Sequence, residues 1–395
     1  MPENDTHPAP GVLTPEAPET SNLMSKRKIR VLINGLHARS GGGVTYLLNM
    51  LPALAEHSDF EFHIFLHSEQ HDIVGDIDDR IRVHLFDFRP GISYLLFWEQ
   101  ICLPILARLM AADVTFSPAN YGPLFAPGSI VLLRNALSVA GRETRPLKRL
   151  YWLALSLMTL LSLFFSRHAI AVSRFALSAL TFGFEGLLRN RLSVVYHGVS
   201  PVYSPADTRP DDSPFLLAVA DIYIQKNLHT LLEAMPAILG AFPGIKLIIA
   251  GRKIDNGYYN ELMERAQRLK LQTSVDFIDS VPQSQLVELY RRCALFVFPS
   301  TVETFGNPLV EAMACGAPIA CSNTAVMPEI VGNCAEFFDP SDASDMAKAV
   351  LRLLDDRGYR KELGQRGVSR AAQFSWKESA RALTAIFRRA APQPR

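Results

Sequence analysis

Short apolar runs alternate along the chain with longer stretches in which apolar residues recur at helical spacing. The first run, 29–34, is followed by glycines at 41–43 and then by leucines at 47, 48, 51 and 54, on one face of a helix. A strand, a glycine turn and a helix in this order open a βαβ unit. Further strand-like runs, with helical stretches between several of them, lie at 60–66, 81–86, 114–117, 130–133, 169–172 and 192–196. This alternation predicts a mostly parallel sheet with helices on both faces.

The alternation stops at residues 200–213, where three prolines and several acidic residues interrupt it. Such a composition is typical of a linker between domains. Beyond it the alternation restarts, with predicted strands at 215–219, 246–250, 275–278, 295–298 and 318–321, and predicted helices around 228–239, 258–269, 284–292 and from 308 onward. The chain is therefore predicted to be an α/β protein with one sheet on each side of the linker.

Length and composition agree with two globular domains. Of the 395 residues, 48% are hydrophobic and 20% are charged, which suffices for two separate cores. The formal net charge is +1, so no overall field favours nucleic acid as a partner. Residues 1–25 are rich in Pro, Glu and Thr and lack an apolar run, and we expect a flexible tail rather than a signal peptide.

Five cysteines without a C-x-x-C pair argue against a disulfide framework and against a zinc ribbon. Cys293 and Cys315 stand among apolar residues, and we interpret them as core residues. No cluster of His, Cys and Asp has the spacing of a metal site, so we predict no metal ligand. The cysteine pattern fits a reducing, cytoplasmic location.

The stretch 298–316 has the features of a ligand-binding loop and helix. A predicted strand is followed by a loop to Gly306, after which Asn307 suits an N-cap and Pro308 suits the first helical position. Gly316 stands where a glycine commonly ends a helix. A helix that begins at the carboxyl end of a parallel strand is a site where phosphate binds in open α/β sheets.

Two carboxylates lie eight positions apart in this stretch, Glu303 in the loop and Glu311 in the helix. Carboxylates grip sugar hydroxyls through charge-assisted hydrogen bonds, so one could hold a transferred sugar and the other the ribose of a nucleotide. Alternatively, Glu303 is a solvated loop residue and Glu311 only interacts with the helix dipole. The spacing alone leaves both interpretations open.

The same stretch resembles the Glu-x7-Glu signature of the retaining GT-B glycosyltransferases of family 4, within glycosyl transferases group 1. It reads FPSTVETFGNPLVEAMACG and continues without a gap into 317–320, with Pro328 and Glu329 further on. Thr304 departs from the pattern, which usually has glycine there. The resemblance implies a GT-B fold, in which two Rossmann-like domains face each other across a cleft.

The resemblance also implies a division of the chain and a set of site residues. Residues 26–205 would form the acceptor domain and 206–375 the nucleotide-sugar domain, and 376–395 would be a closing helix that packs back on the first domain. Glu303 would contact the donor sugar as a catalytic residue, and Glu311 would bind the ribose. The other donor-binding residues in this stretch would be Thr304, Phe305, Gly306, Asn307 and Leu309.

A second motif agrees with the first. The predicted strand 215–219 is followed by Lys226 and Asn227, where the family commonly has a Lys that neutralises the departing diphosphate. Lys226 is therefore a second catalytic candidate and a donor ligand, although a lone lysine at a helix start is more often solvated. The family often has an arginine five residues earlier, where this chain has Asp221. Part of the leaving-group charge must then be met elsewhere.

The first domain offers weaker signals. Gly42 and Gly43 match the family's glycine-rich first loop, in which the backbone approaches the donor phosphate. Relatives commonly have a histidine after the strand at 130–133, whereas this chain has Arg134 and Asn135. Arg134 is either a cleft residue that carries phosphate charge or a surface ion-pair residue. We interpret His197 as a hinge residue rather than a catalyst.

Residues 151–166 contain no charged residue, but they fall short of the roughly 20 residues that a membrane span requires. Basic residues precede and follow them. The helix they predict is either buried in the core of the first domain or lies on an anionic bilayer, where the apolar stretch 94–110 could share the face. In the second case the acceptor would be a lipid-linked glycan.

Together with this resemblance, the sequence predicts an enzyme that moves a hexose-type sugar from a UDP- or GDP-sugar to a glycan or lipid-linked glycan hydroxyl. That the enzyme is metal-independent and retains anomeric configuration is implied by the resemblance. The enzyme needs no cofactor, acts in the cytoplasm or at the inner leaflet of the membrane, and serves cell-surface polysaccharide synthesis. Two alternatives are a synthase of a small soluble glycoside and a non-catalytic nucleotide-binding relative.

Overall fold

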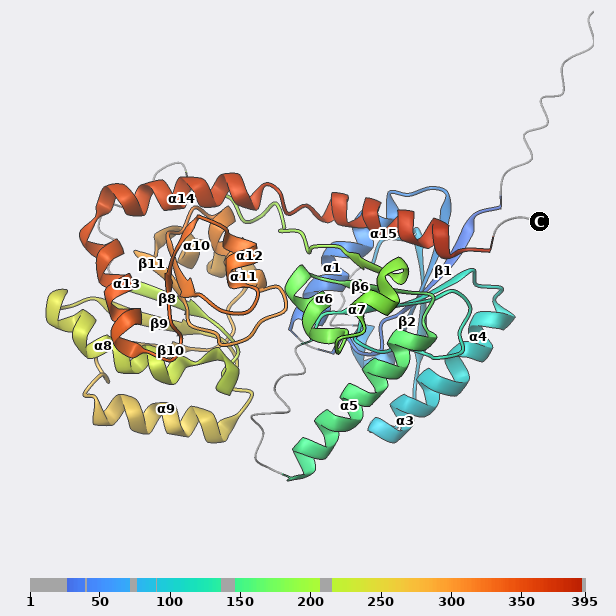
Figure 1. The fold of residues 1–395 in the computed structure, drawn as a ribbon, viewed down its shortest axis with the longest axis horizontal. Coiled ribbons are helices and arrows are strands. Elements are labelled where there is room, and N and C mark those ends of the chain that lie inside the picture. Colours follow the sequence, from blue (N-terminus) through green and yellow to red (C-terminus); the bar gives the residue numbers. More distant parts are fainter. Residues whose placement is uncertain are drawn as a thin grey trace, which may run out of the picture.

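The computed structural model describes residues 27–39, 41–71, 77–89, 91–135, 146–206 and 215–392. The tail expected at 1–25 and residues 207–213 of the expected linker lie outside these ranges. The described residues form two α/β domains, which Figure 1 shows side by side.

The N-terminal domain contains a seven-stranded sheet in the order β3-β2-β1-β4-β5-β6-β7. Every strand pair in it is parallel. Its strands are β1 Ile29–Asn34, β2 Phe60–His67, β3 Ile81–Phe86, β4 Val114–Ser117, β5 Ser129–Leu133, β6 His168–Ala171 and β7 Leu192–Val194. Helices cover both faces, so the central strands are apolar without alternation, and all residues of β4 and β5 are buried.

The C-terminal domain repeats this order in a six-stranded parallel sheet, β10-β9-β8-β11-β12-β13. Its strands are β8 Phe215–Val219, β9 Lys246–Ala250, β10 Val275–Ile278, β11 Leu295–Phe298, β12 Ile319–Ser322 and β13 Ala335–Phe338. In both sheets the strand order reverses between the first and fourth strands, which defines a Rossmann-like topology. Ligands bind at this reversal, outside the carboxyl ends of the strands.

Helices and helical turns connect the strands in both domains. In the N-terminal domain they are α1 Gly42–Ala55, η1 Ser68–Gln70, α3 Ile92–Phe97, the π-helical turn η2 Trp98–Cys102, α4 Leu103–Leu109, α5 Pro146–Phe165, α6 Arg174–Leu180, α7 Glu185–Leu188 and η4 Arg189–Arg191. The helices and turns that follow the first domain along the chain are η5 Ile224–Lys226, α8 Leu228–Ala241, α9 Asn256–Arg268, α10 Gln283–Arg292, α11 Asn307–Ala314, α12 Met327–Val331, α13 Ala343–Asp355, α14 Arg357–Ala371 and α15 Trp376–Ala390.

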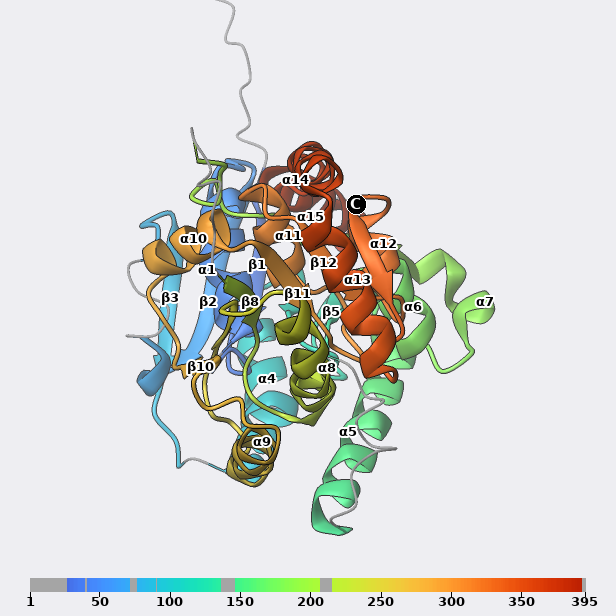
Figure 2. The same cartoon turned by 90° about the vertical axis from the view of Figure 1, so that its left-hand side faces the viewer.

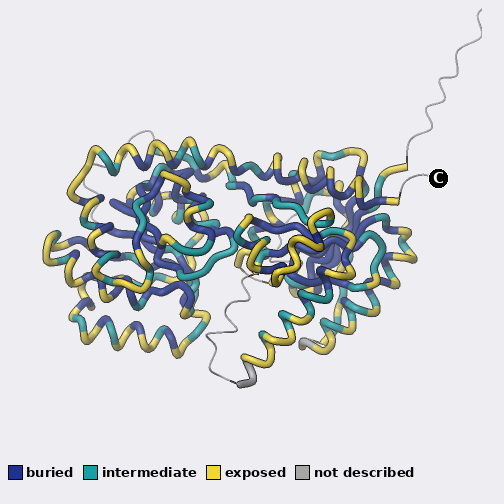
Figure 3. The backbone as a smooth tube through the Cα atoms, in the orientation of Figure 1, coloured by how far each residue is buried: buried dark blue, intermediate teal, exposed yellow. Residues whose placement is uncertain are grey.

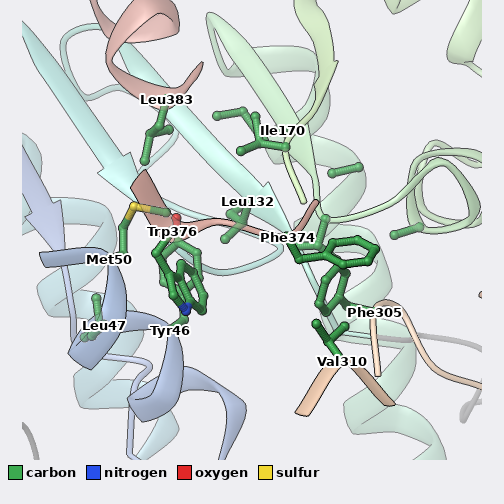
Figure 4. Close-up of a cluster of buried hydrophobic side chains, with 14 of the residues drawn as sticks. Tyr46, Leu47, Met50, Leu132, Ile170, Phe305, Val310, Phe374, Trp376 and Leu383 are labelled. Carbon is green, nitrogen blue, oxygen red and sulfur yellow. The ribbon is translucent and has the colours of Figure 1, made fainter. Parts of the chain in front are cut away.

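The last helix returns to the first domain. Figure 1 shows α15 lying along the N-terminal domain, although α14 before it belongs to the other domain. The ring of Phe387 packs against Phe116, with centroids 5.4 Å apart, and against Phe60 at 6.3 Å. One buried cluster therefore continues between the domains: Figure 4 shows Trp376 beside Tyr46, and Phe305 of the C-terminal domain beside Phe374.

The interpretation of residues 151–166 as a buried core helix holds only in part, because Leu163 of α5 is buried in the core but one side of the helix is not. Leu150, Leu153 and Leu157 are all exposed, whereas Thr159 and Ser162 on the same helix are buried. In two perpendicular views α5 projects from the N-terminal domain (Figures 1 and 2). Within the described ranges, no helix is both long and apolar enough to cross a membrane.

Candidate active site

A cavity of about 810 Å³ lies between the two domains, at the carboxyl ends of both sheets. From the N-terminal domain it is lined by the loop after β1 and by Arg134 and Asn135 after β5. From the other domain it is lined by residues that follow β8, β9, β10 and β11. The cavity therefore occupies the position where Rossmann-like sheets bind their ligands.

The loop after β11 and the helix α11 form one wall of this cavity. The helix begins one residue earlier than predicted: its N-cap is Gly306, Asn307 is its first residue, and Pro308 is its second. Gly306 has φ 78°, a left-handed conformation that glycine adopts without strain. An asparagine N-cap at position 307 would instead have required an extended backbone conformation there. At the other end Gly316, with φ 72°, follows the helix as predicted.

Lys226 and Glu303 meet in this cavity. The Lys226 Nζ lies 2.5 Å from the Glu303 Oε1, and both side chains are largely buried. The turn η5 positions Lys226, and Asn227 after it holds the turn by donating its side-chain amide to the carbonyls of Pro299 and Pro340. The two motifs that the sequence places 77 residues apart thus form one contact.

This contact keeps Lys226 charged. Burial lowers the pKa of a lysine, but the Glu303 carboxylate beside it more than compensates, and the pKa of Lys226 lies above its ordinary value. A buried ammonium held in place in this way can stabilise negative charge on a ligand without reorganisation.

Glu311 has a different environment from Glu303. It lines the cavity, and the Tyr290 hydroxyl donates to its Oε2 at 3.1 Å. Burial raises the pKa of Glu311 from 4.5 to about 7, although hydrogen bonds from Tyr290 and Tyr203 act in the opposite direction. Glu311 is therefore poised between its charged and neutral forms near neutral pH.

The glycine loop and Arg134 form the opposite wall. The Arg134 guanidinium donates to the Gly42 carbonyl at 3.0 Å, and a Cβ on Gly43 would lie 2.7 Å from its Nη2. A larger residue at 43 would therefore displace the Arg134 guanidinium from its present position. The Arg134 Nε is buried without a hydrogen-bond partner, and burial lowers the pKa of Arg134. The structure places Arg134 in the cleft rather than in a surface ion pair among the described residues.

Thr304 joins the two domains. Its hydroxyl donates to the Arg134 carbonyl, and its own carbonyl accepts from the Ser173 hydroxyl at 2.6 Å. Asn135, next to Arg134, is exposed and is held by Asn120, whose side chain bonds to both its N–H and its carbonyl. Phe305 is buried against the ring of His197, 4.8 Å between centroids.

Leu309 is the one predicted site residue that does not line the cavity. Its side chain is fully buried in the core, and its N–H donates to the Gly306 carbonyl at 2.9 Å. The structure therefore gives no support to a donor contact by the Leu309 side chain. The other predicted residues all line the cavity: Gly42, Gly43, Arg134, Asn135, Lys226, Glu303, Thr304, Phe305, Gly306, Asn307 and Glu311.

Arg252 is a cavity residue that the sequence analysis missed. It forms a two-pronged ion pair with Asp221, Nε to Oδ1 at 3.1 Å and Nη2 to Oδ2 at 2.6 Å. The hydrogen bonds that Arg252 donates to the Asp221 carboxylate raise the pKa of Arg252. The acid that replaces the expected arginine thus holds an arginine from the neighbouring strand end. The signal was present, because Arg252 follows strand β9 at the same edge of the sheet.

His197 is a structural residue of this site. Burial lowers its pKa to about 4, so the ring is neutral near pH 7. Its Nδ1 lies 3.1 Å from the Asn307 Oδ1, and its ring stacks on Trp376. His197 thus connects α11 to α15. Among the residues that the structure describes, no group of three His, Cys, Asp or Glu could hold a metal ion.

Comparisons with known proteins agree with this geometry. Over 182 residues the chain is 32% identical to the O-antigen chain mannosyltransferase B of Escherichia coli, covering 44% of this chain and 47% of that protein. It is 31% identical over 215 residues to the D-inositol 3-phosphate glycosyltransferase of Mycolicibacterium smegmatis, covering 51% and 48%. The chain spans about half, or less, of the length of the first curated relatives it matches. A glycosyltransferase structure from Rickettsia africae superposes with a TM-score of 0.70 at 15% identity, covering 92% of this chain and 99% of that one.

Two facing Rossmann-like domains with a shared cavity at their strand ends give the chain a GT-B fold. Residues 201–370 match the model of one family in particular, the glycosyl transferases group 1.

Proposed function

We propose that the protein transfers a hexose-type sugar from a UDP- or GDP-sugar to a hydroxyl acceptor, with retention of anomeric configuration as in GT-B family 4. The observation that carries this proposal is the contact between Lys226 and Glu303 inside the interdomain cavity. It brings a fixed cation and a sugar-binding carboxylate together at the mouth of α11, the position suited to a sugar diphosphate.

Each charged group of the cavity has a role in this reaction. Glu303 accepts hydrogen bonds from the hydroxyls of the donor sugar and orients its anomeric carbon. Lys226 stabilises the charge that develops on the departing diphosphate. Glu311, deeper along α11, accepts from the ribose hydroxyls in its ionised form. No metal ion or cofactor is assigned a step.

Arg134 and Arg252 supply further positive charge. A buried guanidinium with an unpartnered Nε gains a partner when a phosphate oxygen enters the cavity. Arg252 is already oriented by Asp221 and stands at the mouth near Gly41. The two arginines lie on opposite domains, so binding of a diphosphate would hold the cleft closed and exclude water from the transfer.

The acceptor is proposed to be a glycan or a lipid-linked glycan in cell-surface polysaccharide synthesis, reached at the cytoplasmic face of the membrane. The O-antigen mannosyltransferase among the relatives supports this pathway class. A soluble metabolite is the competing class of acceptor, as the name of the D-inositol 3-phosphate glycosyltransferase among the relatives suggests for that protein.

A panel of UDP- and GDP-sugars tests the donor. We expect one donor to raise the melting temperature, because a ligand at a hundred times its Kd adds about 2.7 kcal/mol of apparent stability. The same donor should release nucleoside diphosphate when incubated with enzyme and acceptor. Binding without release would favour a non-catalytic nucleotide-binding protein. The absence of both binding and release would contradict the proposal.

Replacing Glu303 with Gln tests its role in catalysis. The change keeps the side chain's size but removes the charge next to Lys226, and we expect turnover to fall about a hundredfold. The melting temperature should also fall, because the buried Lys226 ammonium loses its ion-pair partner, so turnover is measured at a temperature where the variant is folded. Glu288→Gln on α10 is the matched control, because Glu288 is an exposed acid with an ion pair to Arg291. Unchanged turnover in Glu303→Gln would remove Glu303 from the active site.

A further inference from the structure

A surface helix of a globular protein buries its apolar stripe and exposes polar residues. The helix α5 buries Leu163 in the core, but it also exposes a second apolar stripe and turns polar residues inward. Leu153 and Leu157 are 55% and 56% exposed, and Leu150 lies on the same stripe at 64%. Thr159 and Ser162 face the protein and are 0% and 2% exposed. Figure 3 shows exposed positions recurring along the projecting α5.

The helical segment 92–109, formed by α3, η2 and α4, also exposes a row of apolar residues, although Leu103 and Ala107 on its inner side are buried in a core cluster. Phe97, Ile101, Ile105 and Leu109 follow one another at intervals of four residues, and all four are exposed. On the inner side Glu99 is fully buried, where its Oε1 accepts from the Asn34 side chain at 2.8 Å and contacts His37. Large apolar side chains thus point outward while a carboxylate points inward.

The loop between β4 and β5 joins the two helical stretches into one surface. The exposed ring of Phe125 packs against Phe165 at the end of α5, with centroids 5.6 Å apart. The carbonyl of Phe125 accepts from Arg108 on α4 at 2.5 Å. We call this surface the apolar face, and define it by exposed Phe97, Ile101, Ile105, Leu109, Phe125, Leu150, Leu153, Leu157 and Phe165.

The part of the sequence that contains α5 and the loop between β4 and β5 is rich in basic residues. Between residues 114 and 184 the sequence contains a single acid, Glu143, and its basic residues are Arg134, Arg142, Arg145, Lys148, Arg149, Arg167 and Arg174. Arg149 and Arg167 stand at the two ends of the apolar part of α5, and both are exposed. The whole chain is nearly neutral, so this local excess of positive charge is not a general property.

We propose that the apolar face docks on an anionic lipid bilayer. Exposed leucine and phenylalanine side chains enter the acyl boundary, and the arginines meet the headgroups, as in helices that lie in a membrane interface. The positive charge favours an anionic surface over a second copy of the same face, because two such faces would repel one another. The proposal deepens the proposed function, since it would bring a lipid-linked acceptor to the domain expected to bind it.

Flotation of the full-length protein with vesicles tests this proposal. We expect it to float with vesicles of phosphatidylcholine and phosphatidylglycerol, and not with phosphatidylcholine alone. The double variant Leu153→Glu, Leu157→Glu should lose vesicle binding, since it places charge in the apolar stripe. Arg149→Gln with Arg167→Gln should weaken binding about tenfold or more, from about 1 kcal/mol for each basic residue at an anionic surface.

The control is Leu85→Glu with Val202→Glu, because these side chains are 48% and 44% exposed but lie outside the apolar face. Leu85 points to the opposite side of the sheet from Phe86, whose ring packs against Trp98. This variant should float like the wild type. The proposal would be overturned if the wild type did not float, or if the control variant lost vesicle binding as completely as the variant Leu153→Glu, Leu157→Glu. It would also be overturned if the protein did not bind lipid but self-associated, and this self-association were lost in Leu153→Glu, Leu157→Glu.

Release of nucleoside diphosphate from a soluble donor and acceptor, measured on the same variants, separates the two proposals. Vesicle binding by a protein without transferase activity would contradict the proposed function but leave the apolar face intact. Full activity in solution without vesicle binding would support the proposed function and contradict membrane docking by the apolar face.

Discussion

Glu311 carries a consequence for stability at the scale of one residue. A carboxyl whose pKa is raised by folding, here from 4.5 to about 7, binds more protons folded than unfolded. Its contribution to stability is therefore fully present below pH 4.5 and is lost as the pH rises to about 7. Between these two pH values the free energy of unfolding falls by about 3 kcal/mol through this group.

We accordingly expect Glu311→Gln to be more stable than the wild type above about pH 7 and no more stable at acid pH. Urea unfolding of both proteins across this range measures the difference. The comparison is needed because His197, whose pKa is lowered to about 4, makes stability rise with pH between 4 and 6.5 in both proteins. A constant difference at all pH values would contradict the raised pKa.

Single residues also mark the limit of what the sequence could predict. Glu303 and Lys226 could be found because both stand in motifs of recognisable spacing, and the structure brings them into contact. Leu309 was assigned wrongly, because helical phase decides whether a side chain faces the cavity or the core. Arg252 was missed because its position depends on an ion pair with Asp221, a partner distant in the sequence.

At the scale of elements, Glu329 binds the start of a helix in the other domain. Its carboxylate accepts from the N–H groups of Arg174 and Phe175, at 2.8 and 2.9 Å, and from the Tyr196 hydroxyl at 2.8 Å. An anion at a helix N-terminus satisfies N–H groups that have no partner within the helix.

We expect Glu329→Ala to lower the free energy of unfolding by about 1–2 kcal/mol and to speed amide exchange at Arg174 and Phe175. Chemical denaturation and hydrogen exchange measure the two effects. Glu185→Ala, at the exposed start of α7, serves as the control. Protection of these amides that survives the Glu329 change would show that the interdomain contact does not depend on this carboxylate.

Strands were the elements best predicted from the sequence. Strands buried on both faces read as apolar runs, and β4, β8 and β11 among them have the predicted bounds. The predicted bounds also hold for β1, β9 and the edge strands β3 and β10. The sequence analysis did not identify β13 or α14. The inner positions of α14 include Gly364, Gly367 and Ala371, which pack closely against α11 and leave no apolar stripe to recognise.

At the scale of the whole molecule, α15 belongs to the first domain although it is last in the chain. We expect Phe387→Ala to cost about 3–5 kcal/mol of unfolding free energy, because the ring is fully buried between Phe60 and Phe116. Arg381→Ala on the same helix removes only an exposed ion pair and should be nearly neutral. Similar small effects of both substitutions would mean that the packing of α15 on the first domain does not contribute to its stability.

The return of α15 makes the chain cross between the domains twice, and the two crossings touch. The Val199 N–H donates to the Phe374 carbonyl at 3.1 Å, and the Ser379 hydroxyl donates to the Tyr196 carbonyl at 2.6 Å. Two adjoining crossings permit rotation about the line between them and resist sliding or twisting. In the proposed reaction, nucleotide and product would then leave past the same free edge of the cleft, and one rotation of the domains would release both.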